Sequence, residues 1–280
     1  MVALRRDDRL DHVADITRRH PRHGLGEERT GRPLAPPVEL PDWEVGAHHG
    51  WHDIDGPADG PDGRHRALGL PVPSGKVAGG LRLALRRLIA DGTVRGLRVT
   101  ARQDLLLLGV SDTDAVENVL RANGVRLADD QSPTRNLAIA CPALPTCSKA
   151  LGEAERVLPD VVDRLEKVLA DTGNTGLPLR LNMTGCPNGC SRPYAAELGI
   201  VGRTKKNYDI FVGGSPSGDR LARLLRADVP LTDVPELLRP LLEAFGRSDD
   251  ATSFGDWCFA QDWSALEALL PRPTGRRRAR

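Results

Sequence analysis

Four of the five cysteines occur in two close pairs, and paired thiolates are ligands for soft metals and iron–sulfur clusters. Five residues separate Cys141 from Cys147, and three separate Cys186 from Cys190. The pairs themselves are 38 residues apart, from 148 to 185. Four thiolates held on loops suit a [4Fe–4S] cluster, which is bound by four cysteines.

Other uses of these cysteines follow from different spacings. Structural zinc favours pairs with two to four intervening residues, which the second pair satisfies and the first does not. All seven histidines precede residue 66, so a mixed Cys/His site has little support. A redox dithiol favours C-x-x-C, which is absent. Spacing alone therefore favours an iron–sulfur cluster, with zinc and inert buried thiols as the alternatives.

Each cysteine pair follows a predicted strand and enters a turn rich in Pro and Gly. The first strand covers 137–140, and the second covers 179–183, where apolar residues alternate with polar ones. Prolines in both turns fix the backbone, and Gly189 relieves crowding between two ligands. The remaining predictions for this region are a helix over 149–170 with a break near Pro159, strands over 198–201 and 208–212, and short helices over 219–226 and 235–245.

The region before the cysteines predicts a second layered unit. It contains a strand and turn over 67–75, a helix over 76–90 with apolar positions from Val77 to Ile89, strands over 97–100 and 105–110, and a helix capped by Ser111 and closed by Gly124. This order predicts an α+β fold, ferredoxin-like in outline. The predicted parts are a linker-like segment (1–42), a ferredoxin-like half-domain (43–135), a cluster domain (136–272) and a disordered basic tail (273–280).

Composition and charge exclude several classes of protein. Hydrophobic residues make up 40% of the 280 residues and charged residues 28%, as in ordinary globular proteins. The formal net charge of +1 predicts no nucleic-acid or membrane-surface partner. No stretch reaches the ~20 apolar residues of a membrane-spanning helix, and the first residues lack the apolar core of a signal peptide. We therefore expect a cytoplasmic protein without disulfides.

The cysteine motifs resemble those of a known family. ACPALPTCSKALGEAERVLP and NMTGCPNGCSRPYAAELGIVGR resemble the two cluster motifs of the sulfite and nitrite reductase haemoproteins. GWHDIDG, RALGLPVPSGKV and RVTARQDLLLLGV are similar to the ferredoxin-like half-domain that precedes those motifs, and SFGDWCFAQD is similar to a segment near the family's C-terminus. The resemblance spans about residues 43 to 270.

This resemblance implies cofactors and a reaction. It implies an α+β fold in which the half-domain precedes an α/β sirohaem/[4Fe–4S] domain. The four paired cysteines become the cluster ligands, and Cys190 matches the thiolate that bridges the cluster to the sirohaem iron. The implied reaction is the six-electron reduction of sulfite to sulfide, with ferredoxin or a similar donor. The alternatives are reduction of nitrite to ammonia and a non-catalytic cluster-binding fragment. CPALPTC and GCPNGC look more like sulfite-type members, and GWHD and SFGDWC look like ferredoxin-dependent ones.

Other positions are carried over from the resemblance residue by residue. Gln103 matches a residue that contacts sirohaem, and Arg192 is a candidate for binding a propionate. Thr184 and Asn188 lie inside the cluster turn, where they are candidates for hydrogen bonds to cluster sulfur or to the macrocycle; ordinary turn chemistry is the alternative. This chain has Arg102 and Asp104 where the family usually has Asn. Arg102 is a candidate partner for a sirohaem carboxylate, with a solvated arginine as the alternative.

The main departure from the family is length, because the chain matches only the second of two homologous halves. We therefore expect a fragment, a split-gene product or a small protein that pairs with another chain or with itself, and the catalytic residues stay unassigned. Cys258 is predicted to be a packing residue. His48, His49 and His52 are predicted to be surface or strand-edge histidines, and Lys205-Lys206 to be a solvated turn.

Overall fold

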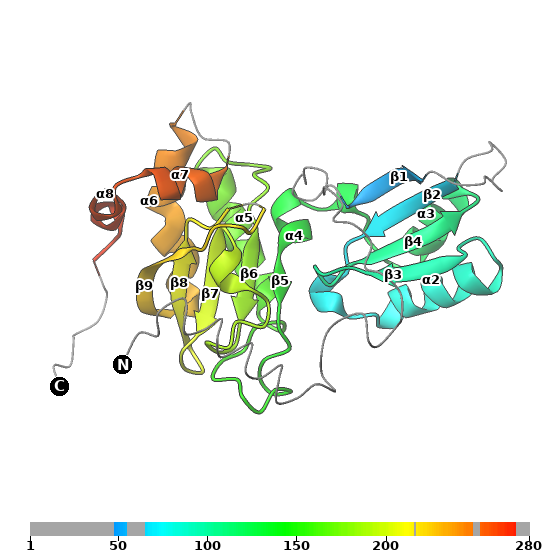
Figure 1. Ribbon diagram of the computed structural model, residues 1–280, viewed down its shortest axis with the longest axis horizontal. Coiled ribbons are helices and arrows are strands. Elements are labelled where there is room, and N and C mark those ends of the chain that lie inside the picture. Colours follow the sequence, from blue (N-terminus) through cyan, green and yellow to red (C-terminus); the bar gives the residue numbers. More distant parts are fainter. Residues whose placement is uncertain (1–47, 55–64, 216, 249–252, 273–280) are drawn as a thin grey trace, which may run out of the picture. The chain divides into compact units, whose positions relative to one another are not determined.

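The computed structural model describes residues 48–54, 65–215, 217–248 and 253–272. The predicted linker (1–42), the basic tail (273–280) and most of a predicted surface loop (53–63) lie outside these residues. The described chain forms two sheets with their helices (Figure 1). The predicted α+β class is confirmed.

The first sheet is antiparallel, with strand order β1-β2-β4-β3. Its strands are β1 (Gly50–Ile54), β2 (His65–Leu70), β3 (Gly96–Val99) and β4 (Leu105–Val110). Its helices are α2 (Gly79–Ala90) and α3 (Thr113–Ala122). Because β4 lies between β2 and β3, which α2 connects, this is the split βαβ arrangement of ferredoxin-like folds. The sequence predictions missed β1, whose mixed Gly-Trp-His-Asp-Ile sequence shows no clear alternation.

Two details of the first unit differ from the predictions. Helix α2 begins at Gly79, so Val77 precedes it, and both Val77 and Ile89 are exposed instead of joining the core. Asp112 caps α3, not Ser111, because the Asp112 carboxylate accepts a hydrogen bond from the Ala115 N–H at 2.9 Å. The predicted glycine closure is present, since Gly124 follows the helix with φ +73°.

The second sheet is mixed, with strand order β5-β6-β7-β8-β9. The first three strands are parallel to one another, whereas β8 and β9 run antiparallel to their neighbours. The strands are β5 (Ile139–Ala140), β6 (Leu181–Thr184), β7 (Leu198–Gly202), β8 (Asn207–Val212) and β9 (Arg223–Pro230). The helices are α4 (Pro133–Leu137), α5 (Leu158–Asp171), α6 (Val234–Gly246), α7 (Phe254–Ala260) and α8 (Trp263–Leu269). Short 3-10 turns occupy Pro73–Gly75, Ala128–Asp130, Pro193–Ala195 and Leu231–Asp233.

One prediction for this region is confirmed in part and two are wrong. The predicted strand over 137–140 is present at 139–140 as β5, whereas Leu137 is the last residue of α4. The predicted helix over 149–170 begins only at Leu158, because Pro159 occupies its first turn, where a missing N–H costs nothing. The predicted helix over 219–226 is replaced by β9, since pairing with β8 overrides the helical preference of its Leu, Ala and Arg residues.

Strand β6 is a fully buried interior strand of this sheet. All four of its residues are buried, which is typical of a strand with parallel neighbours on both sides. Helices α5 and α6 contact each other and contribute Leu165, Leu169, Leu238 and Leu241 to the same core (Figure 1). This core holds β5 and β6 in register, and the two cysteine pairs follow these strands.

Candidate functional site

The two cysteine loops begin at the same edge of the second sheet. Strands β5 and β6 are parallel neighbours, with Ala140 opposite Met183, so their carboxyl ends meet there. Cys141 directly follows β5, and its N–H donates to the Met183 carbonyl at 3.1 Å. The Gly185 N–H, just beyond β6, donates to Cys141 Sγ at 3.4 Å. Strand pairing therefore brings together cysteines that are far apart in sequence.

The first loop is tightly folded and bound to the second. The Cys147 N–H donates to the Ala143 carbonyl at 2.7 Å, and Ala143 has φ +51°. The Leu151 and Gly152 N–H groups both donate to the Gly185 carbonyl, at 2.8 and 2.9 Å. A Cβ on Gly185 would lie 2.6 Å from the Ala143 Cβ, so the close approach of the two loops requires glycine there.

The second loop is a tight turn that places Cys190 beside Cys186. The Gly189 N–H donates to the Cys186 carbonyl at 3.4 Å, and Gly189 has φ +67°. A Cβ at this position would also lie 2.9 Å from Tyr194 Cε2. Thr184 Oγ1 donates to the Cys186 carbonyl at 3.0 Å, so this hydroxyl proton stabilises the turn. The predicted role of Gly189 in relieving crowding agrees with both features.

The four thiols differ in exposure. Cys141 and Cys186 are buried, Cys147 is half-buried and Cys190 is exposed. Burial raises the pKa of the Cys141 thiol, the N–H groups of Gly185 and Ala143 oppose this rise, and the nearby Cys190 and Cys186 thiols add to it. These three sulfur atoms therefore share one electrostatic neighbourhood.

The spacing of the thiols disfavours a compact zinc site. Tetrahedral zinc with Zn–S bonds of about 2.3 Å holds its sulfur ligands ~3.8 Å apart. Among the described residues, the group of three ligand atoms found within 4.8 Å of one another is His48, His49 and Asp104, and no trio of cysteine sulfurs is that close. A cluster of several iron atoms separates its ligands more widely than one metal ion does, so it does not require such a close trio.

The turn between β3 and β4 lies against the first cysteine loop. Gln103 has φ +71°, and its Nε2 donates to the carbonyl of Ala140, the residue before Cys141, at 2.9 Å. Arg102 Nη2 donates to the Leu137 carbonyl. From the other side, Arg192 Nη2 donates to the Ala101 carbonyl at 2.6 Å. Predicted residues Gln103 and Arg192 are therefore placed beside the cysteine loops.

Several buried polar atoms around this turn have no hydrogen-bond partner within the described chain. They are Nε and Nη1 of Arg102, Oε1 of Gln103 and Oδ1 of Asn182. Burial and the guanidinium groups of Arg180 and Arg192 lower the pKa of Arg102 to about 10, although Asp104 opposes the shift. Buried guanidinium groups that repel one another and lack hydrogen-bond partners are stabilised by an anionic ligand, which supplies both negative charge and acceptors. The residues thus fit a cofactor that carries carboxylates.

Sequence reasoning missed Asn182. Its side chain is fully buried, and Nδ2 donates to the carbonyls of Ser191 at 2.8 Å and Arg192 at 3.1 Å. This pair of bonds fixes the chain just after Cys190. A polar residue inside an otherwise apolar buried strand was the available signal. Asn188, by contrast, is exposed at the tip of the turn.

Several residues predicted to have no role in the cysteine site lie elsewhere in the structure. Cys258 is fully buried, which agrees with a packing role, and Lys205 and Lys206 are exposed in the turn between β7 and β8. The prediction of surface or strand-edge histidines holds in part, because His48 and His49 directly precede the edge strand β1 and His52 lies in it. The His49 side chain, however, is only 7% exposed and contacts Asp104. None of the described helices is both long and apolar enough to cross a bilayer.

Hollows in the surface do not mark the cysteine site. Two hollows, of about 590 and 610 Å³, lie along the surface near α3, α4 and α5, and no cysteine lines either of them. The candidate site is defined by its donor chemistry, because two adjoining cysteine loops and unpaired buried donors are more specific than the volume of an open hollow.

The region that contains the paired cysteines is similar to a known protein domain. The family model of the nitrite and sulphite reductase 4Fe-4S domain matches residues 133–255, which contain all four paired cysteines. The sulfite reductase [NADPH] hemoprotein beta-component of Acidithiobacillus ferrooxidans is 40% identical over 256 residues, covering 90% of this chain and 44% of that protein. The sulfite reductase [ferredoxin] of Synechococcus elongatus is 38% identical over 243 residues, covering 84% of this chain and 38% of that protein.

Solved structures agree in fold. The Mycobacterium tuberculosis NirA protein has a TM-score of 0.63 at 22% identity, covering 84% of this chain and 43% of that one. Dissimilatory sulfite reductase I has a TM-score of 0.57 at 12% identity, covering 78% of this chain and 74% of that one. The chain spans less than half the length of the two sulfite reductases described above. The matched domain and the relatives at about 40% identity over most of the chain show that it belongs to the sulfite and nitrite reductase haemoprotein family.

Proposed function

We propose that the chain holds a [4Fe–4S] cluster on Cys141, Cys147, Cys186 and Cys190. The observation that carries this proposal is the convergence of two hydrogen-bonded cysteine loops at the ends of β5 and β6. Their mutual N–H bonds fix the loops before any cofactor enters, so little ordering is required when the thiolates bind iron. The N–H of Gly185, which already reaches Cys141 Sγ, would stabilise negative charge on that thiolate.

We further propose that sirohaem binds beside the cluster, with Cys190 as the shared thiolate. Cys190 is the exposed member of the four, so its sulfur can face a second group while the other three face inward. Arg102 supplies two unpaired buried N–H donors for a carboxylate, and Arg192 adds a second guanidinium. Gln103 orients this turn through Ala140. Asn188 stays a predicted hydrogen-bond donor to cluster sulfur or to the macrocycle, whereas Thr184 has its one hydroxyl proton on the Cys186 carbonyl and supports the turn.

The proposed reaction is the six-electron reduction of sulfite to sulfide. Bound sirohaem and cluster would supply the electron-transfer chemistry, while the residues of this chain bind, orient and charge-balance them. Similar proteins named sulfite reductase favour sulfite over nitrite. Because the chain spans under half of those relatives, we propose that a second chain supplies the other half of the site. The resemblance of GWHD and SFGDWC to ferredoxin-dependent members favours ferredoxin as the donor.

Cluster binding is tested by anaerobic reconstitution of the full chain with iron and sulfide. We expect about four iron and four sulfide per chain. Changing any of the four paired cysteines to alanine should lower this content, whereas Cys258→Ala, the matched control, should retain it because Cys258 is buried in the core. Zinc binding in place of iron and sulfide, or equal cluster content in all five variants, would contradict the assignment.

Sirohaem binding is tested separately, by adding sirohaem to the cluster-loaded chain and following its absorption. Arg102→Met preserves much of the side-chain length but removes the donors, so it should weaken retention by more than about tenfold. Arg98→Met, on the exposed face of β3, is the control and should have no effect. Equal retention by both variants would refute the role of Arg102.

Activity distinguishes the enzyme from a non-catalytic fragment. The loaded chain is assayed with an artificial electron donor on sulfite and on nitrite, alone and with a protein that resembles the first half of the family. Turnover only in the mixture supports a divided enzyme. Absence of turnover in both samples, with both cofactors bound, would leave a cluster-binding protein and refute the proposed reaction.

A further inference from the structure

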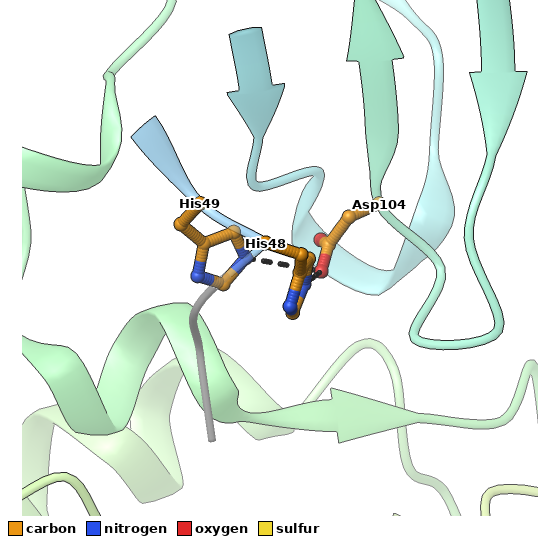
Figure 2. A group of neighbouring side chains, drawn as sticks. All are labelled: His48, His49 and Asp104. Carbon is orange, nitrogen blue, oxygen red and sulfur yellow. Dashed lines mark hydrogen bonds and ion pairs between the residues drawn. The ribbon is translucent and has the colours of Figure 1, made fainter. Parts of the chain in front are cut away.

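We propose that His48, His49 and Asp104 form a binding site for one divalent transition-metal cation, separate from the cysteine loops. Their ligand atoms lie within 4.8 Å of one another. Nε2 of His48 and Nε2 of His49 approach the same oxygen, Asp104 Oδ2, at 2.8 and 3.1 Å (Figure 2). Two imidazoles and a carboxylate are a common donor set for zinc, iron(II) and related cations.

The three side chains converge from distant parts of the sequence. Both histidines come from the segment that enters β1, and Asp104 immediately precedes β4 (Figure 2). Strands β1 and β4 are not neighbours, because β2 lies between them. The histidine rings lie with centroids 4.0 Å apart and planes at 45°, so both edges can face one point.

The site is largely closed to water. The side chains of His49 and Asp104 are 7% and 5% exposed, and that of His48 is 18% exposed. Exposure at His48 leaves one open side, where a cation could enter and keep a water or other ligand in its remaining coordination position. Partial burial also strengthens binding, because the carboxylate charge is screened less than on the surface.

A second layer of contacts fixes the carboxylate. Asp104 Oδ1 accepts a hydrogen bond from the Val72 N–H at 3.0 Å, which leaves Oδ2 to the histidines. The Asp104 N–H donates to Thr100 Oγ1 at 3.1 Å. Outer contacts of this kind orient metal ligands and raise affinity. A Cβ on Gly69 would lie 1.5 Å from the His48 carbonyl, so this glycine lets the histidine segment lie against β2.

Little movement is needed to admit a cation. Ligands at about 2.0 to 2.1 Å from tetrahedral zinc lie ~3.3 Å apart. The two nitrogen–oxygen separations in the trio, 2.8 and 3.1 Å, are within about 0.5 Å of this spacing, and the two Nε2 atoms lie within 4.8 Å of each other. A cation requires an unprotonated Nε2 on each ring, so the hydrogen bonds to Asp104 would give way to metal bonds and each ring would carry its proton on Nδ1.

A cation here would connect the start of β1 to the start of β4 and, through Val72, to the chain after β2. It would also order the turn that carries Arg102 and Gln103, because Asp104 follows them directly. The site does not depend on the proposed cluster, and neither proposal fails with the other.

Cobalt(II) is a suitable probe, because its weak visible bands report nitrogen and oxygen ligands whereas thiolates add strong near-ultraviolet absorption. The full, cluster-free chain is titrated with cobalt after its accessible thiols have been alkylated, so that those thiols cannot bind the ion and no cluster absorption hides its bands. We expect one cobalt per chain without new thiolate absorption. His49→Gln and Asp104→Asn should weaken binding by more than about 100-fold, the upper range for loss of an outer contact alone.

Two further variants and one spectrum separate metal binding from a structural role. Asn at 104 can still accept the Val72 N–H, so that variant should keep the fold, which circular dichroism checks. His52→Gln changes another histidine of β1 that is outside the trio, and it should bind cobalt like the parent chain. Zinc should likewise shift the ring resonances of His48 and His49 in the parent protein. Unchanged affinity in both ligand variants, or unmoved His48 and His49 resonances, would overturn the proposal.

Discussion

Gly189→Ala tests whether the second cysteine turn is as sterically constrained as its geometry indicates. Gly189 has φ +67°, and alanine in this left-handed region costs about 1 to 2 kcal/mol. The new methyl group would also lie 2.9 Å from Tyr194 Cε2. That ring cannot easily retreat, because Tyr194 Oη donates to the Pro187 carbonyl at 3.0 Å and the ring packs edge-on against Phe211 at 5.0 Å.

Overpacking of this kind costs about 1 to 3 kcal/mol, so we expect a total loss of about 2 to 5 kcal/mol in the free energy of unfolding. Gly173→Ala separates the two contributions. Gly173 has φ +77°, and a Cβ added there would meet no atom within 4 Å, so its alanine variant should lose only the backbone share of about 1 to 2 kcal/mol.

Both variants are measured as cluster-free chains by denaturant unfolding, and their cluster content is then measured after reconstitution. We expect Gly189→Ala to lose both stability and cluster, and Gly173→Ala to lose stability alone. If the two variants unfold with equal free energies, the contact with Tyr194 is not a constraint. If Gly189→Ala also binds a full cluster, the conformation of this turn does not determine how the thiolates are presented.

Three further predictions concern groups outside that turn. Burial raises the pKa of Tyr208 from 10.0 to about 12, so the folded protein holds the phenol neutral while the unfolded chain ionises it. Stability should therefore fall as pH rises above 10, by about 1.4 kcal/mol at about pH 11, and Tyr208→Phe should remove this dependence in pH-dependent unfolding. Burial also raises the pKa of the Cys258 thiol, which makes this thiol unreactive in the folded chain. Alkylation followed by peptide mass spectrometry should therefore label Cys190 in the native cluster-free chain and Cys258 only after unfolding. Labelling of Cys258 in the native chain would refute its burial. Arg192 has φ +57°, so in Arg192→Gly the relief of backbone strain should offset the added entropy of the unfolded chain. We expect this variant to change the unfolding free energy by less than about 1 kcal/mol but to reduce sirohaem retention. A large loss of stability would indicate that Arg192 is mainly structural.

Elements with strong local patterns could be predicted from the sequence. The apolar periodicity of α5 and the short apolar runs of β4, β7 and β8 were sufficient to identify them. Strand β9 could not be found in this way, because its residues favour a helix and only pairing with β8 makes it a strand. Strand β5 is too short to carry a pattern, and it is in the sheet because of its partner β6.

The candidate site could likewise be predicted only where a local motif reports it. The proposed ligands could be predicted, because four cysteines in two close pairs are themselves the signal for an iron–sulfur site. The buried contacts of Asn182 with Ser191 and Arg192, and the convergence of His48, His49 and Asp104 from segments about 55 residues apart, depend on how the strands assemble, which no local motif reports. The sequence therefore predicted His49 as a surface or strand-edge residue, which agrees with its place before the edge strand β1 but gave no sign that its side chain contacts a buried carboxylate.

The adjacency of β5 and β6 has a consequence for how such sites evolve. The cysteine pairs meet because their strands are neighbours, and the 38 residues between the pairs contain the crossover helix α5, which leaves this sheet and returns to it. Lengthening that crossover would change the number of residues between the pairs without moving either pair, since a longer connection costs little free energy. Spacing within a pair is thus under chemical constraint, whereas spacing between pairs can drift. A search for distant relatives should fix the first and leave the second free.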